Sequence, residues 1–119
     1  MINMLIESYS FGRMVIDGKE YQNDLMIYAD EIHPNWIRKS GHQLVPEDLD
    51  WIVEKNPDLL IVGKGSSGLM EVTDRTGAFL QENDIDLWIG KTDEAVDRFN
   101  SEMDSDSQKT VSAAFHLTC

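Results

Sequence analysis

The hydrophobic residues of the first forty positions fall into short segments separated by turn-forming residues, a pattern that predicts four β-strands: 13–16, 19–21, 25–28 and 32–37. The first two flank Asp17-Gly18, a dipeptide typical of a two-residue hairpin because both turn positions need positive φ. The fourth is interrupted at Pro34, which cannot donate to a sheet ladder. Together they predict an N-terminal antiparallel β-meander.

The rest of the chain alternates between helical and strand patterns, which predicts a helix over 46–56, a strand over 59–62, a helix over 73–83, a strand over 85–89, a helix over 92–103 and a strand over 111–117. Pro46 followed by two acids is a helix start signal, and Thr92 is expected to cap its helix. The uninterrupted apolar run 59–62 is typical of a strand buried on both faces, so we expect it at the centre of the sheet.

This order of elements predicts the fold class, because strands that alternate with helices form right-handed crossovers onto parallel sheets. We expect an α/β, layered single domain spanning residues 1–119. Its mixed, largely parallel sheet has flanking helices, and the N-terminal antiparallel β-meander extends it.

Length and composition agree with one globular domain, since 119 residues with 41% hydrophobic and 27% charged residues are ordinary for that class. The longest apolar run, 25–29, is far below the roughly 18 residues of a membrane-spanning helix. Residues 1–7 show no basic leader, and the single cysteine, Cys119, agrees with a reducing compartment. We therefore expect a cytoplasmic protein without a membrane partner.

The net charge of −12 is spread evenly over both halves of the chain. Nucleic-acid affinity comes largely from clustered Lys and Arg, so this charge argues against a nucleic-acid partner. A well-solvated surface explains the acidity without any partner.

One motif that could carry chemistry follows the predicted buried strand and fits the pattern G-x-G-x-x-G: Gly63-Lys64-Gly65-Ser66-Ser67-Gly68. Glycines there allow backbone amides to approach a phosphate closely. However, the next helix begins several residues later, and the strand ending at Ile89 is not followed by an acid that could hold a ribose. A tight turn is the favoured interpretation, and no cofactor is predicted.

A geometric argument keeps this edge as a candidate binding site. The crevice of an open parallel sheet lies beyond the carboxyl ends of its strands, where residues 63–68 and 90–92 fall. An anion or the carboxylate of a partner could be held there by backbone amides, by Lys64 and by hydroxyls, which gives the candidate ligand-binding residues Gly63, Lys64, Gly65, Ser66, Ser67 and Thr92. Each of these polar residues also suits a turn or a cap.

A second cluster, residues 36–42, combines Trp36, the adjacent pair Arg38-Lys39 and His42. This loop could close over the crevice and supply Arg38 or His42 to a ligand. In the alternative, Trp36 fills the core while the charges face solvent.

Neither a metal site nor a catalytic residue is predicted. His116 and Cys119 would face opposite sides of a regular strand, and His33 and His42 complete a small set of soft ligands. No nucleophile elbow, metalloprotease motif or P-loop signature is present.

Ordered blocks over nearly the whole chain resemble the MTH-nine-three-eight-like domain family: 9–13, 16–21, Trp36 with Arg38 and Gly41-His42, 60–65, 92–100 and 116–119. That family includes an adipogenesis-associated protein and a mitochondrial respiratory complex I assembly factor, together with many uncharacterised members. The resemblance implies a layered α/β domain with a mixed sheet and supplies no catalytic residues. Lys64 stands where threonine is expected in the family.

These observations give two functional hypotheses. The first is a non-catalytic protein-binding or assembly module that offers residues 63–68 and the 36–42 loop to a partner. The alternative is a binder or enzyme for a small anionic metabolite or nucleotide at the same edge. Stabilisation by such a compound would separate the two.

Overall fold

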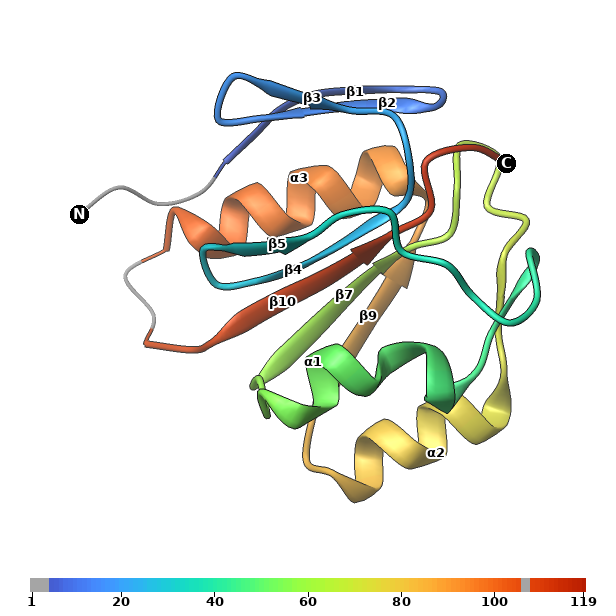
Figure 1. Ribbon diagram of the computed structural model, residues 1–119. Coiled ribbons are helices and arrows are strands. Elements are labelled where there is room, and N and C mark those ends of the chain that lie inside the picture. The colour runs from blue at the N-terminus through green and yellow to red at the C-terminus, as the bar shows by residue number, and fades with distance from the viewer. Residues whose placement is uncertain (1–4, 106–107) are drawn as a thin grey trace.

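A five-stranded sheet runs through the computed structural model, which describes residues 5–105 and 108–119 (Figure 1). The N-terminal stretch considered for a leader therefore lies mostly outside the described residues. In order across the sheet, its strands are β5 (Glu31–His33), β4 (Leu25–Tyr28), β10 (Val111–Phe115), β7 (Leu59–Gly63) and β9 (Asp86–Gly90).

The sheet is mixed, as predicted. β7 pairs in parallel with both β10 and β9, whereas β4 pairs antiparallel with β10 and with β5. The prediction of a buried, interior parallel strand over 59–62 is confirmed, although β10 rather than β7 is the middle strand. All five residues of β10 are buried, including the polar Ser112, whose hydroxyl donates to the Leu59 carbonyl at 2.9 Å.

Helices cover both faces of this sheet (Figure 1). On one face lie the 3₁₀-helix η1 (Pro46–Leu49), α1 (Asp50–Glu54) and α2 (Asp74–Glu82), and on the other lies α3 (Thr92–Met103). Because β7 is buried on both faces, its alternate side chains belong to two separate apolar clusters. Ile61 packs in the cluster of α3, and Leu60 and Val62 pack in the cluster of α1 and α2.

A separate three-stranded antiparallel sheet consists of β1 (Ile6–Ser10), β2 (Arg13–Ile16) and β3 (Lys19–Tyr21). The predicted hairpin is confirmed, with φ of 51° at Asp17 and 80° at Gly18. The expectation that the whole meander extends the main sheet was wrong, because only β4 and β5 do so.

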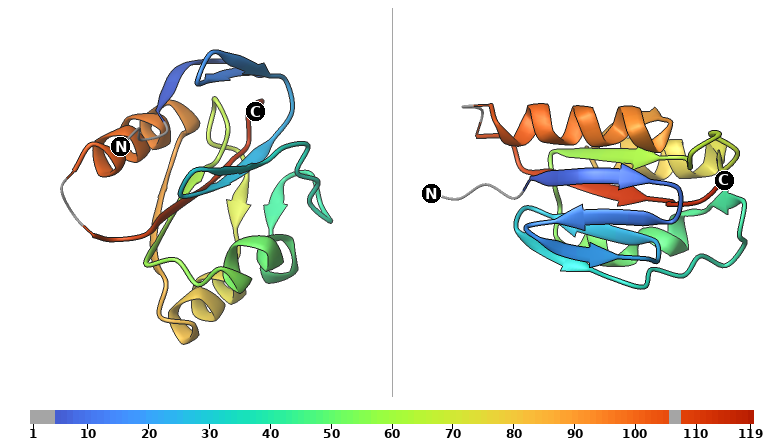
Figure 2. Two further views of the ribbon diagram at one scale, coloured as in Figure 1. Left: turned by 60° about the vertical axis from the view of Figure 1, so that its left-hand side comes forward. Right: turned by 90° about the horizontal axis from the view of Figure 1, so that it is seen from above.

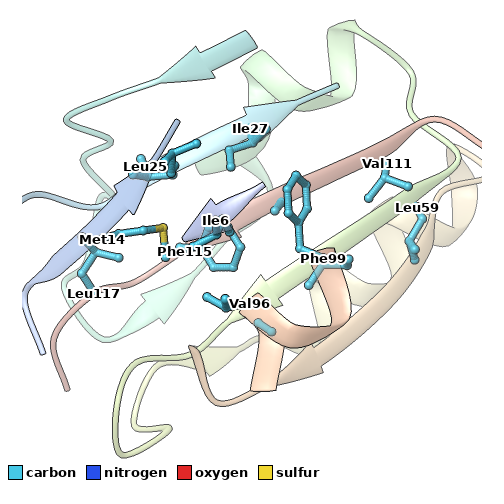
Figure 3. Packing of buried hydrophobic residues seen from close by; sticks show 14 residues of the cluster. Ile6, Met14, Leu25, Ile27, Leu59, Val96, Phe99, Val111, Phe115 and Leu117 are labelled. Carbon is cyan, nitrogen blue, oxygen red and sulfur yellow. The ribbon is translucent and has the colours of Figure 1, made fainter. Parts of the chain in front are cut away.

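The three-stranded sheet instead lies beside α3, over the same face of the main sheet (Figures 1 and 2). Its buried side chains Ile6 and Met14 join one cluster with Phe99 of α3 and Phe115 of β10 (Figure 3). The rings of Phe99 and Phe115 meet edge to face, with centroids 6.2 Å apart. This packing removes the apolar side of the small sheet from water.

A short parallel pair, β6 (Gln43–Leu44) with β8 (Glu71–Val72), connects two loops at the carboxyl end of the main sheet. It joins the segment that follows the 36–42 loop to the segment that follows residues 63–68. Within the described ranges, the longest helix is α3 with 12 residues, and none is long and apolar enough to cross a membrane.

Candidate functional site

The carboxyl ends of β7, β9 and β10 meet at one end of the molecule (Figure 1). The glycine loop, residues 63–68, lies there beside the C-terminal segment, residues 116–119. The candidate site is built from these two segments, from Thr92 at the start of α3 and from the 36–42 loop.

Backbone amides of the glycine loop donate to the chain itself. Lys64 N donates to the Gly90 carbonyl at 2.9 Å, and Ser66 N donates to the Thr118 carbonyl at 2.6 Å. Gly68 N donates to the Gly65 carbonyl at 3.2 Å. These three donors are therefore engaged and do not point at an open anion site.

Thr92 is a fully buried link between the glycine loop and the C-terminal segment. Its hydroxyl accepts from Gly65 N at 2.8 Å and donates to the His116 carbonyl at 2.6 Å. The prediction that Thr92 caps α3 was wrong: Lys91 is the N-cap, and its amide is bonded by the Glu94 carboxylate at 3.1 Å. The Thr92 hydroxyl, which would bond the helix N-terminus in a cap, instead bonds Gly65 N and the His116 carbonyl.

Close approach of the C-terminal segment explains why glycine stands at position 65. Its φ is +103°, and an added Cβ would lie 2.6 Å from the backbone carbonyl of Cys119. At Gly63, an added Cβ would lie 2.9 Å from Thr92 Oγ1. The glycines thus make room for the chain's own backbone and side chains.

A buried polar cluster lies against the C-terminal segment. Asp24, just before β4, accepts from Arg38 Nη1 at 2.7 Å and from Leu117 N at 2.7 Å. Its Oδ2 is also 2.8 Å from His116 Nδ1. The side chains of Arg38, His116 and Asp24 are only 5%, 7% and 16% exposed.

Electrostatics in this cluster favour the Asp24 carboxylate. Burial by itself raises the pKa of Asp24, but the hydrogen bonds from His116, the Leu117 amide and Arg38 outweigh it, so the pKa lies below its ordinary value. The Arg38 guanidinium also stacks 5.0 Å from the centre of the Trp36 ring. Among the described residues, Arg38 Nε and His116 Nε2 are buried without a hydrogen-bond partner.

Tyr9 of β1 adds a further bond to the same segment. Its hydroxyl donates to the Leu117 carbonyl at 2.8 Å, which also accepts from Gly12 N at 2.8 Å. Burial raises the pKa of the Tyr9 phenol above its ordinary value. The C-terminal segment is therefore bonded by the glycine loop, the start of α3, the turn before β4, and β1 with the turn that follows it.

The sequence matches the model of a family described as "Protein of unknown function (DUF498/DUF598)" over residues 6–116. The chain belongs to this family. Its sequence and structure therefore assign it to a group of proteins without an established role.

Solved structures agree with this membership. The conserved hypothetical protein PH1505 from Pyrococcus horikoshii OT3 is 28% identical, with 98% of this chain and 100% of that chain covered and a TM-score of 0.81. MT938 is 25% identical, with 98% and 99% covered and a TM-score of 0.78. A protein from Bordetella pertussis, described as a Mth938-like domain, shares the fold at 11% identity with a TM-score of 0.64, over 96% of this chain and 85% of that chain. The resemblance to the MTH-nine-three-eight-like family is confirmed.

In this family member, most of the predicted site residues lie together. Gly63, Lys64, Gly65, Ser66, Ser67 and Thr92 gather at the carboxyl end of the sheet, with the two serines exposed and Lys64 half-buried. Arg38 is linked to them through His116, whose backbone amide donates to the Gly63 carbonyl at 3.0 Å. His42 is exposed and takes part through its carbonyl, which accepts from Glu71 N at 2.7 Å. Ligand binding by these residues stays a prediction.

Sequence reasoning missed Asp24 and Tyr9 and considered His116 only as a metal ligand. Asp24 stands in a polar turn, and no local pattern ties it to residues more than ninety positions later. Within residues 5–105 and 108–119, no group of three His, Cys, Asp or Glu side chains is arranged to hold a metal ion.

Large apolar side chains project to solvent around the C-terminal segment. Phe11 is 64% exposed, Ile37 86% and Leu69 61%. Phe11 precedes Gly12, which bonds Leu117; the amide of Leu69 donates to the Cys119 carbonyl at 3.0 Å; and Ile37 lines a cavity of about 450 Å³ with Thr118. We call these three residues the apolar rim.

Proposed function

We propose that the chain is a non-catalytic module that binds a protein partner through the apolar rim, Phe11, Ile37 and Leu69. The carrying observation is that three loops, each anchored to or facing residues 117–119, present a large apolar side chain that is more than half exposed. Single exposed apolar residues are common on protein surfaces, whereas a group around one feature is typical of an interaction site.

The polar groups at this edge support a structural role better than a chemical one. The amides of Lys64, Gly65 and Ser66 all donate within the chain. Asp24 and His116 form a dyad, but both side chains are largely buried. Arg38 contacts both members of the dyad, and the Leu117 amide donates to Asp24. Such a network holds rigid the C-terminal segment and the loops that carry the apolar rim.

Anchoring makes the rim suitable for recognition. A loop that is already ordered by buried hydrogen bonds loses little conformational freedom when a partner binds. The C-terminal segment supplies this order to the Phe11 turn and to the Leu69 loop, through bonds of 2.8 Å and 3.0 Å. We place this interaction in the cytoplasm, where the single cysteine suits a reducing environment.

The test is a partner capture followed by a titration. The tagged chain is crosslinked in cells of its source organism, captured proteins are identified by mass spectrometry, and the purified partner is titrated calorimetrically. The combined substitution Phe11→Ser, Ile37→Ser and Leu69→Ser should raise the dissociation constant at least about a hundredfold, because apolar anchors dominate interface energies.

Leu5→Ser is the matched control, because Leu5 is 41% exposed and lies before β1, away from the rim. It should leave the titration unchanged. Equal binding by the triple variant and the native chain would reject the proposal.

The alternative function, binding of a small anionic metabolite or nucleotide, uses the side chains that the loop leaves accessible: Lys64, Ser66 and Ser67. Thermal unfolding with phosphate, carboxylate metabolites and nucleotides tests it. Stabilisation that disappears in Lys64→Ala, with no protein partner captured, would favour this alternative over the rim.

A further inference from the structure

The two edges of the main sheet differ in a way that the proposed function does not use. β5 has three residues, Glu31-Ile32-His33, and Pro34 follows it. Short, charged, proline-bounded edges are how proteins prevent unwanted strand pairing. β9 is longer and has the apolar centre Leu87-Trp88-Ile89, with no proline. Only the β5 edge carries the protection expected of a surface that stays unpaired.

The outer side of β9 carries free backbone groups. Asp86 N donates to the Asp58 carbonyl, and the Gly90 carbonyl accepts from Lys64 N. In a parallel ladder alternate residues bond to the same neighbour, so Asp86, Trp88 and Gly90 face β7. Leu87 and Ile89 therefore direct their N–H and C=O groups outward, where the described residues form no further strand.

Side chains at this edge suit an additional strand. Leu87 and Ile89 point to the same face because the side-chain period of a strand is two. Ile89 is 41% exposed, and Leu87 is half-buried against the cluster of α1 and α2. An added strand would cover apolar surface as well as satisfy four backbone groups.

Charged residues flank β9 at both ends. Near its start, a groove of about 470 Å³ is lined by Gly77, Gln81, Asp84, Ile85, Asp86 and Leu87. At its end stands the exposed Lys91, followed by Asp93 and Glu94 in the first turn of α3. Within residues 5–105 and 108–119, none of Asp84, Asp86 and Lys91 has an ion-pair partner.

We propose that β9 pairs antiparallel with β9 of a second copy of this chain, joining two five-stranded sheets about a two-fold axis at Trp88. Antiparallel pairing places the end of one strand beside the start of the other. When Leu87 pairs with Ile89, Lys91 of each copy lies opposite Ile85 of the other copy, next to Asp84 and Asp86. The strand is thus complementary to itself in charge, as an isologous interface requires.

Backbone geometry selects one register. When Leu87 pairs with Ile89 of the second copy, the outward N–H and C=O groups of one copy lie opposite those of the other. Four hydrogen bonds then form across the two-fold axis. Shifts by two residues would place Ile85 or Lys91 in the ladder. Their amides are already engaged, by the Leu80 carbonyl at 3.0 Å and by the Glu94 carboxylate at 3.1 Å.

The first test is sedimentation equilibrium of the full chain from about 1 μM to about 1 mM. The native chain should form dimers, and Ile89→Pro should weaken dimerisation at least about tenfold by removing an outward donor from each copy. The Ile89 amide takes no part in the β7 ladder, so circular dichroism should show a folded variant. Leu5→Ser is the surface control and should dimerise like the native chain.

A charge exchange tests the same contact without altering the ladder. Lys91→Glu alone, and the pair Asp84→Lys with Asp86→Lys alone, should each dimerise more weakly than the native chain, because like charges then meet across the two-fold. Mixed together, the two variants should form a heterodimer, because both contacts across the two-fold then join opposite charges.

Three results would overturn the proposal: a native chain that is monomeric throughout, a dimer that is as tight in Ile89→Pro as in the native chain, or charge variants that fail to restore pairing when mixed. Hydrogen exchange identifies the strand directly. If the Leu87 and Ile89 amides gain protection only when a different protein binds, the occupant of β9 is that protein and not a second copy.

Discussion

The guanidinium of Arg38 lies 2.7 Å from the carboxylate of Asp24, and both side chains are largely shielded from solvent. This pair ties the 36–42 loop to the residue that precedes β4. Through the second oxygen of Asp24, which accepts from Leu117 N at 2.7 Å, it also holds the C-terminal segment. One carboxylate therefore joins three parts of the chain at the carboxyl end of the sheet.

We expect Asp24→Asn to lower the free energy of unfolding by about 3 kcal/mol, because removing one member of a buried ion pair leaves the other charge uncompensated. The variant keeps the shape of the side chain and removes its charge, so a loss reports on the electrostatic role. Urea denaturation followed by circular dichroism measures the change.

Glu20→Gln is the matched control for this prediction. Glu20 pairs with Arg13 at 2.6 Å, but both side chains are at least 40% exposed. Surface pairs contribute about 0–1 kcal/mol, so the control should barely change the unfolding midpoint. Similar losses of unfolding free energy in both variants would show that the burial of Asp24 does not increase the contribution of its ion pair.

The depressed pKa of Asp24 predicts a pH dependence. Burial opposes the shift, but the bonds from His116, Leu117 N and Arg38 place the folded-state pKa below the unfolded one. Between the two values the unfolded state binds more protons, so stability rises with pH there. The contribution of Asp24 is complete above about pH 4 and is lost as the pH falls through its folded-state pKa.

Urea denaturation of the native chain and of Asp24→Asn at several pH values from 6 to about 3 tests this window. The gap in unfolding free energy between them should be constant near neutrality and should narrow below about pH 4. A gap that stays unchanged down to the lowest pH would contradict a protonation at Asp24.

Local chemistry made much of the fold predictable. The hairpin was predictable because Asp17-Gly18 suits the two positive φ angles that its turn adopts. The interior position of 59–62 was predictable from its continuous apolar run. The place of β10 between β4 and β7 was not predictable from any local pattern. It depends on pairing partners that lie 52 and 84–90 residues earlier in the chain.

The candidate site shows the same division. Strand ends and glycines located residues 63–68 and Thr92 at one edge, and the basic cluster singled out Arg38. What these residues contact is set by the return of residues 116–119, which bring His116 and Leu117 to Asp24 and Thr92. A strong capping propensity at Thr92 pointed to a local bond, but burial favoured a tertiary one.

The glycine loop offers a prediction in which two glycine substitutions act in opposite directions. Gly65→Ala should lower the free energy of unfolding by about 2 kcal/mol or more, because its φ of +103° is strained for alanine and the added Cβ would overlap the Cys119 backbone. Gly77→Ala should raise it by about 0.5–1 kcal/mol. Gly77 is inside α2, an added Cβ there meets nothing within 4 Å, and alanine has the higher helix propensity. Thermal and urea unfolding of both variants measure the two shifts. Equal effects at the two positions would mean that neither the φ of Gly65 nor its contact with the C-terminal segment constrains the loop.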